Sequence, residues 1–151
     1  MIARHDPASA RVVLGFDFGV RRVGVALGNT LTGTARALQT IDSASDAVRF
    51  ERIAALVRDW RPDRLVVGRP LDEAGTPTDT TRRAERFANR LRGRFGLPVE
   101  AVDERFSSRE ARAIIEATGG RRDDEDAVAA AVILEQWLDG HRRPPDAPAP
   151  G

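Results

Sequence analysis

The strongest constraint on the fold of this chain comes from two apolar runs that are joined by a very short turn. The run RVVLGFDF occupies residues 11–18, and the run VGVALGN at residues 23–29 follows after only four residues. A third run, ARALQTI at residues 35–41, comes after another short, glycine-bearing connection. Such short connections join antiparallel neighbours, whereas parallel strands need a long crossover. We therefore expect an antiparallel meander of three strands.

Beyond this meander, the spacing of apolar residues changes. Spacings of three and four predict helices, and short, wholly apolar runs predict buried parallel strands. In chain order we expect a helix over 45–60, a strand over 64–68, a helix over 79–94, a strand over 97–104, and helices over 107–118 and 126–140. Three leading strands followed by alternating helices and strands predict an α/β fold, with a mixed five-stranded sheet flanked by helices.

The two ends of the chain lack the pattern of a packed element. Residues 1–10 show no apolar periodicity, and residues 141–151 are rich in Pro and Ala. Such segments bury too little apolar surface to offset an ordering entropy of about 1–2 kcal/mol per residue. We expect a mobile arm over 1–10, one folded domain over 11–140 and a disordered tail over 141–151, with both ends dispensable for activity.

Composition excludes several classes of protein. The N-terminal region has no apolar segment of a secretory signal, and no apolar run approaches the roughly 18–20 residues of a membrane span. The chain has no cysteine, which excludes disulfides and thiolate metal sites. We expect a soluble, cytoplasmic protein with no membrane partner.

Three acidic residues stand where packing alone would not put them. Asp17 lies inside the first apolar run, Glu104 ends the last predicted strand, and Asp126 begins the Ala-rich last helix. Each has an ordinary explanation: a strand end, a surface charge, or an acid favoured by the positive end of a helix dipole. Together they predict more, because strand ends at one edge of an α/β sheet form its usual functional site.

Clustered carboxylates need a cation to be stable. They repel one another, and burial raises the cost of their charge. Oxygen ligands without His or Cys suit Mg²⁺ or Mn²⁺, and a pair of such ions supports in-line hydrolysis of a phosphodiester. A rigid strand would hold such a ligand in place, which explains an acid at Asp17.

Four blocks of the sequence resemble the signature blocks of the YqgF family. They are LGFDFGVRRVGVALGN, LVVGRPLDEAGTPTDTTRRAERFANRL, LPVEAVDERFSSREA and DEDAVAAAVILEQWL, in this order over about residues 11–139. Members of that family are described as pre-16S rRNA nucleases or as Holliday-junction-resolvase-like proteins. The resemblance implies a ribonuclease H-like fold and a metal-dependent nuclease that processes the 5′ end of precursor 16S rRNA during ribosome biogenesis.

The resemblance also implies roles for individual residues. The aspartate of the family's first block corresponds to Asp17, the acid of its D-E-R block to Glu104, and the aspartate that opens its last helix to Asp126. These three would be the catalytic residues and the ligands of Mg²⁺ or Mn²⁺. The acidic run RRDDEDA leaves Asp124 as an alternative to Asp126, although the distance to VILEQWL favours Asp126.

Arginine supplies every one of the 24 basic side chains, and several gather on one predicted helix. Arg83, Arg86 and Arg90 lie opposite its apolar positions, and Glu85 is the only acid between Thr80 and Gly96. A solvated face is the ordinary interpretation. A face of one sign also fits a phosphate backbone, so we expect these arginines to bind nucleic acid.

Arg22 and Arg105 are further candidate substrate-binding residues. Several alternatives remain open. The same carboxylates would serve a Holliday-junction resolvase that acts on branched DNA, and such an enzyme would favour a homodimer because a junction has two strands to cut. A non-catalytic nucleic-acid-binding module would keep the fold alone. An ATP-binding domain of the actin and sugar-kinase type shares the turn between its first strands but normally needs two domains.

Overall fold

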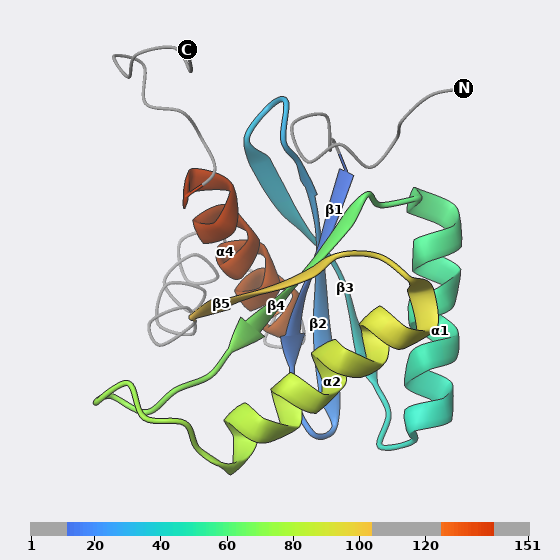
Figure 1. Ribbon diagram of the computed structural model, residues 1–151. Helices are drawn as coiled ribbons and strands as arrows, with labels where there is room; N and C mark the ends of the chain where they lie inside the picture. Colours follow the sequence, from blue (N-terminus) through green and yellow to red (C-terminus); the bar gives the residue numbers. More distant parts are fainter. Residues whose placement is uncertain (1–11, 104–124, 141–151) are drawn as a thin grey trace, which may run out of the picture.

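The computed structural model describes residues 12–103 and 125–140, which form one sheet with helices on both faces (Figure 1). The strands are β1 (Val12–Phe18), β2 (Arg22–Asn29), β3 (Thr34–Asp42), β4 (Arg64–Arg69) and β5 (Val99–Asp103). The helices are α1 (Asp46–Trp60), α2 (Asp79–Phe95) and α4 (Glu125–Gly140). The strand order is β3-β2-β1-β4-β5, with β1, β4 and β5 parallel and the first three strands antiparallel, which confirms the predicted mixed sheet.

Side-chain alternation along β1 divides the core in two. Leu14 and Phe16 pack with α1 and α2 on one face of the sheet. Val13 packs with α4 on the other face, and a Cβ on Gly15 would touch Leu134 of α4. Because successive strand residues point to opposite faces, each odd-numbered residue of β1 lies on the α4 face. This alternation determines which face of the sheet Asp17 occupies.

Local signals fix the ends of the helices close to the predicted bounds. Ser45 caps α1, and its hydroxyl accepts a hydrogen bond from the Val48 N–H. Thr78 caps α2, in a reciprocal arrangement with Thr81. Gly96 ends α2 in the left-handed conformation, with φ of 65°. These are the caps that short polar side chains and glycine favour.

Several predictions lie outside the described residues: the helix over 107–118 and the two chain ends over 1–10 and 141–151. The predicted strand over 97–104 begins two residues later, at Val99, because Pro98 cannot donate a backbone hydrogen bond. No helix in the described part of the chain has the length and apolar character to cross a bilayer.

Gly93 in α2 and Gly96 at its C-terminal cap provide a test of this local account. A Cβ at Gly93 meets nothing within 4 Å, so Gly93→Ala should stabilise the protein by about 0.5–1 kcal/mol through a lower backbone entropy of the unfolded chain. Gly96→Ala should destabilise it, because Gly96 has a positive φ. Urea denaturation would measure both, and a loss of stability in Gly93→Ala would contradict the assignment of an open, helical position.

Candidate active site

Asp17 lies near the C-terminal end of β1 on the sheet face that α4 covers. Its direct partner on β2 is Gly24, in the antiparallel pairing of the two strands. Opposite residues of such a pair lie roughly 4.5–5.5 Å apart at their Cα atoms and point to the same face. The Asp17 side chain is half-buried. The carboxylate therefore stands beside the position where Gly24 has no side chain.

Asp126 occupies that position with its backbone. A Cβ built on Gly24 would come within 1.8 Å of the Asp126 carbonyl oxygen and 2.8 Å of the Ala127 nitrogen. Only a glycine allows the first turn of α4 to lie so close to the sheet. The structure thus brings the first turn of α4, with Asp126, next to the strand partner of Asp17, although the two acids are far apart in sequence.

An arginine pairs with Asp126. The Nε of Arg22 lies 3.1 Å from the Asp126 Oδ2 atom, and the two side chains are 51% and 29% exposed. Burial raises the pKa of Asp126 above its usual value, the Arg22 charge lowers it, and the charges of Glu125 and Asp42 raise it further. Arg22, a predicted substrate-binding residue, thus contacts a candidate catalytic acid, and half of its side chain stays open to solvent.

The raised pKa of Asp126 makes the stability of the metal-free protein depend on pH. The folded state keeps the Asp126 proton to a higher pH than the unfolded state does. The folded protein therefore loses stability as the pH rises through the window above 3.8 and the partly buried carboxyl group ionises. Asparagine cannot ionise. The stability of Asp126→Asn relative to the unchanged protein should therefore increase with pH across that window. Urea denaturation from pH 3 to 7 would measure this, and a constant or shrinking difference would contradict it.

Three other residues of the predicted site, Glu104, Arg105 and Asp124, lie outside the described residues. Within residues 12–103 and 125–140, no group of three His, Cys, Asp or Glu side chains is arranged to hold a metal ion. The Asp126 backbone lies against Gly24, the strand partner of Asp17, and the carboxylate oxygens of two such residues are donors that suit Mg²⁺ or Mn²⁺.

The predicted arginines of α2 gather on the opposite sheet face. Arg83, Arg86 and Arg90 line a pocket of about 310 Å³ beside the β1–β2 turn. Two acids compensate part of their charge. Arg90 lies 2.8 Å from Asp46 of α1, and Arg83 lies 3.4 Å from Asp79. Asp46 belongs to α1, which is distant from α2 in sequence, so the spacing of residues in α2 could not indicate this ion pair.

Arg49 was missed by the sequence analysis. It is only 6% exposed, and it donates to the carbonyl oxygens of Gly19 at 3.0 Å and Val20 at 2.8 Å. It thereby holds the turn that follows Asp17 against α1. The one feature of the sequence that could have indicated its burial was its position beside the apolar residues of a predicted helix. An arginine at such a position is ordinarily exposed to solvent.

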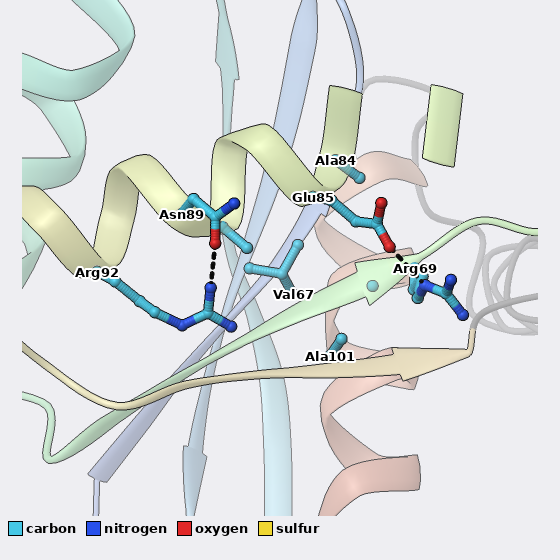
Figure 2. A pocket seen from close by; sticks show the side chains of 9 residues that line it. Val67, Arg69, Ala84, Glu85, Asn89, Arg92 and Ala101 are labelled. Carbon is cyan, nitrogen blue, oxygen red and sulfur yellow. Dashed lines mark hydrogen bonds and ion pairs between the residues drawn. The ribbon is translucent and has the colours of Figure 1, made fainter. Parts of the chain in front are cut away.

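A second pocket, of about 340 Å³, lies between α2 and the strands β4 and β5 (Figure 2). Figure 2 shows small side chains such as Ala84 and Ala101 around it, and an ion pair between Arg69 and Glu85 at its rim. Val67, which lines it, packs with the core on the α1 and α2 face. The pocket therefore lies across the sheet from Asp17 and Asp126.

Comparison with known proteins gives consistent results. The model of the RuvX family, described as Holliday junction resolvase, matches residues 11–140. A protein of Paraburkholderia xenovorans is 51% identical over 128 residues, covering 85% of this chain and 88% of the relative. One of Burkholderia mallei is 53% identical with the same coverage. Both are named as candidate pre-16S rRNA nucleases. These matches confirm the predicted resemblance.

Solved structures agree on the fold. A Thermus thermophilus RuvC in complex with a Holliday junction substrate has a TM-score of 0.54 at 18% identity, covering 86% of this chain and 95% of that one. A fowlpox virus resolvase with its junction DNA has a TM-score of 0.59 at 11% identity, covering 87% and 99%. At such identities the likeness concerns the fold alone, and the ribonuclease H-like fold is confirmed.

Proposed function

The chain belongs to the RuvX family and is a phosphodiester-cleaving nuclease, and from this membership we propose that it is a divalent-metal-dependent endonuclease acting on precursor 16S rRNA. The observation that carries the metal-dependent part is the contact of the Asp126 backbone with Gly24, the strand partner of Asp17. It supports a two-carboxylate centre where β1 and α4 meet.

The residues of this centre would divide the work. Asp17 and Asp126, with Glu104 as the third acid, would hold Mg²⁺ or Mn²⁺. A bound ion of this kind lowers the pKa of water and neutralises charge on the phosphodiester oxygens. Arg22, which pairs with Asp126, would orient that carboxylate and, through its exposed half, contact a substrate phosphate. Arg105 is a further candidate contact.

Two observations bear on the substrate. The relatives at 51% and 53% identity carry names that refer to pre-16S rRNA, whereas the family model is described by Holliday junctions. We favour RNA, and specifically the 5′ end of precursor 16S rRNA, because these relatives match along most of both chains. On this account the protein acts in the cytoplasm, where ribosomes are assembled. Branched DNA is the second candidate, and it would favour a homodimer.

The direct experiment offers both substrates to the same purified protein. Labelled precursor 16S rRNA and a synthetic four-way DNA junction would be incubated with Mg²⁺ or Mn²⁺, and products would be mapped on denaturing gels. We expect defined cleavage near the 5′ end of the rRNA and little cleavage of the junction. Paired symmetric cuts in the junction, with intact rRNA, would overturn the choice of substrate and retain the nuclease.

A further inference from the structure

The pocket that the arginines of α2 line is built differently from an ordinary solvated surface. It lies between α1 and α2 and beside the β1–β2 turn, and nine residues surround it: Phe18, Val20, Asp46, Arg49, Phe50, Arg83, Arg86, Phe87 and Arg90. Four are arginines and one is an acid. This lining gives the pocket a clear excess of positive charge, which favours an anionic occupant.

The arginines are only partly neutralised. Asp46 is shared by two of them, at 2.5 Å from Arg49 and 2.8 Å from Arg90. These two hydrogen bonds hold the pKa of Asp46 below its usual value, so it is ionised at neutral pH. Arg86 makes no ion pair within the described part of the chain, and its side chain is exposed. At least one guanidinium is thus available for an external anion.

Aromatic rings hold some of these guanidinium groups in place. The Arg90 guanidinium carbon lies 4.5 Å from the ring centre of Phe50, and that of Arg49 lies 5.7 Å from the ring centre of Phe18. The Phe50 and Phe87 rings are themselves packed against each other, 5.7 Å between centres. Cations lying on fixed rings lose less side-chain entropy when they bind an anion than free surface arginines do.

The position of the pocket relative to the carboxylates indicates what the anion is. Asp17 and Phe18 are adjacent in β1 and point to opposite faces, Asp17 to the α4 side and Phe18 into the pocket. Only the β1–β2 turn separates the two sites along the chain. Val20 on this turn is 55% exposed, although apolar, and it also lines the pocket. A nucleic-acid strand at Asp17 would reach the pocket by crossing this turn.

We propose that the pocket between α1 and α2 binds a phosphate of the substrate strand a few nucleotides from the cleaved bond, so that the strand wraps over the β1–β2 turn. This inference rests on the proposed nuclease function and adds where the strand runs. An internal phosphodiester and a terminal phosphate monoester share the chemistry that the arginines recognise. Bidentate guanidinium contacts suit both groups.

The first arm of the test measures binding without metal, so that cleavage does not interfere. Fluorescence anisotropy in EDTA would follow a labelled single-stranded RNA from the precursor. We expect Arg86→Ala to weaken binding about three- to tenfold and to lower the salt slope by about 1. Arg82→Ala is the matched control. It removes the same charge from the same helix, but Arg82 does not line the pocket. It should change affinity much less.

A second variant should strengthen binding. Asp46→Asn removes the one acid of the pocket and leaves an oxygen that can still accept from Arg49. We expect affinity to rise several-fold. Equal losses in Arg86→Ala and Arg82→Ala would show that only the overall charge matters and would overturn the pocket. No gain in Asp46→Asn, with the melting temperature preserved, would show that the charge of the pocket does not act on the RNA and would overturn it as well.

The third arm distinguishes an internal phosphodiester from a terminal phosphate. It also distinguishes failure of the anion site from failure of the proposed nuclease function. Oligonucleotides of increasing length would carry a 5′ phosphate or a 5′ hydroxyl. A length threshold independent of the 5′ group assigns an internal phosphodiester, and dependence on the 5′ phosphate assigns a strand end. If wild-type protein binds through Arg86 but never cleaves with metal, the nuclease proposal fails while the anion site remains.

Discussion

Asp17→Asn should abolish metal-dependent cleavage and leave the chain folded. The substitution removes the carboxylate that the rigid end of β1 places beside Asp126, so metal affinity and cleavage rate should each fall at least about 100-fold. The amide keeps the size of the side chain. Because it also removes the cost of keeping a half-buried carboxylate charged, the metal-free protein should be equally or slightly more stable. Single-turnover cleavage and a thermal melt would measure the two effects.

A matched control is available on α1. Asp59→Asn makes the same chemical change at an exposed residue on the last turn of that helix. It should cleave at the rate of the unchanged protein. Cleavage by Asp17→Asn at that same rate in Mg²⁺ would remove Asp17 from the metal centre.

Gly24→Ala should be the most disruptive substitution of a small residue in the described part of the protein. Its Cβ would overlap the backbone of Asp126, 1.8 Å from the carbonyl oxygen and 2.2 Å from the carbonyl carbon. Backbone atoms of a packed helix cannot turn away as a side chain can, so the first turn of α4 must leave the sheet. We expect a loss of about 3 kcal/mol or more in stability and loss of cleavage.

Gly28→Ala provides the comparison on the same strand and the same helix. Its Cβ would meet the Leu134 Cδ2 atom at 2.8 Å, the end of a flexible side chain that can change rotamer. The stability loss should be much smaller, and cleavage should persist. If Gly24→Ala were as stable and as active as Gly28→Ala, the close contact between β2 and α4 would be wrong.

Most of the fold could be predicted from the sequence, because the features that determine each helix, strand and turn are local. The short connections after Phe18 and Asn29 allow only antiparallel pairing, and the apolar run of β4 is typical of a strand covered on both faces. Caps such as Thr78 and Gly96 act within a few residues. Physical forces of short range therefore determine the elements and their order.

The candidate site was only partly accessible from sequence, because its contacts join distant segments. Asp17 and Asp126 stood out as acids in apolar surroundings. Nothing in the local sequence indicated that the missing side chain of Gly24 lets the first turn of α4 lie next to β1 and β2. The pairing of Asp46 with Arg90 spans two helices, and the burial of Arg49 depends on a turn about 30 residues away. Such pairings follow from tertiary packing, which helical spacing does not encode.

The most direct test of the account measures the metal itself. Mn²⁺ would be titrated into the metal-free protein and followed by electron paramagnetic resonance, for the unchanged chain, Asp17→Asn, Asp126→Asn and the control Asp59→Asn. The account predicts a saturable Mn²⁺ site in the unchanged protein and in Asp59→Asn, weakened at least about 100-fold in the other two variants. Equal Mn²⁺ binding by all four proteins, each shown to be folded, would contradict a metal centre between β1 and α4.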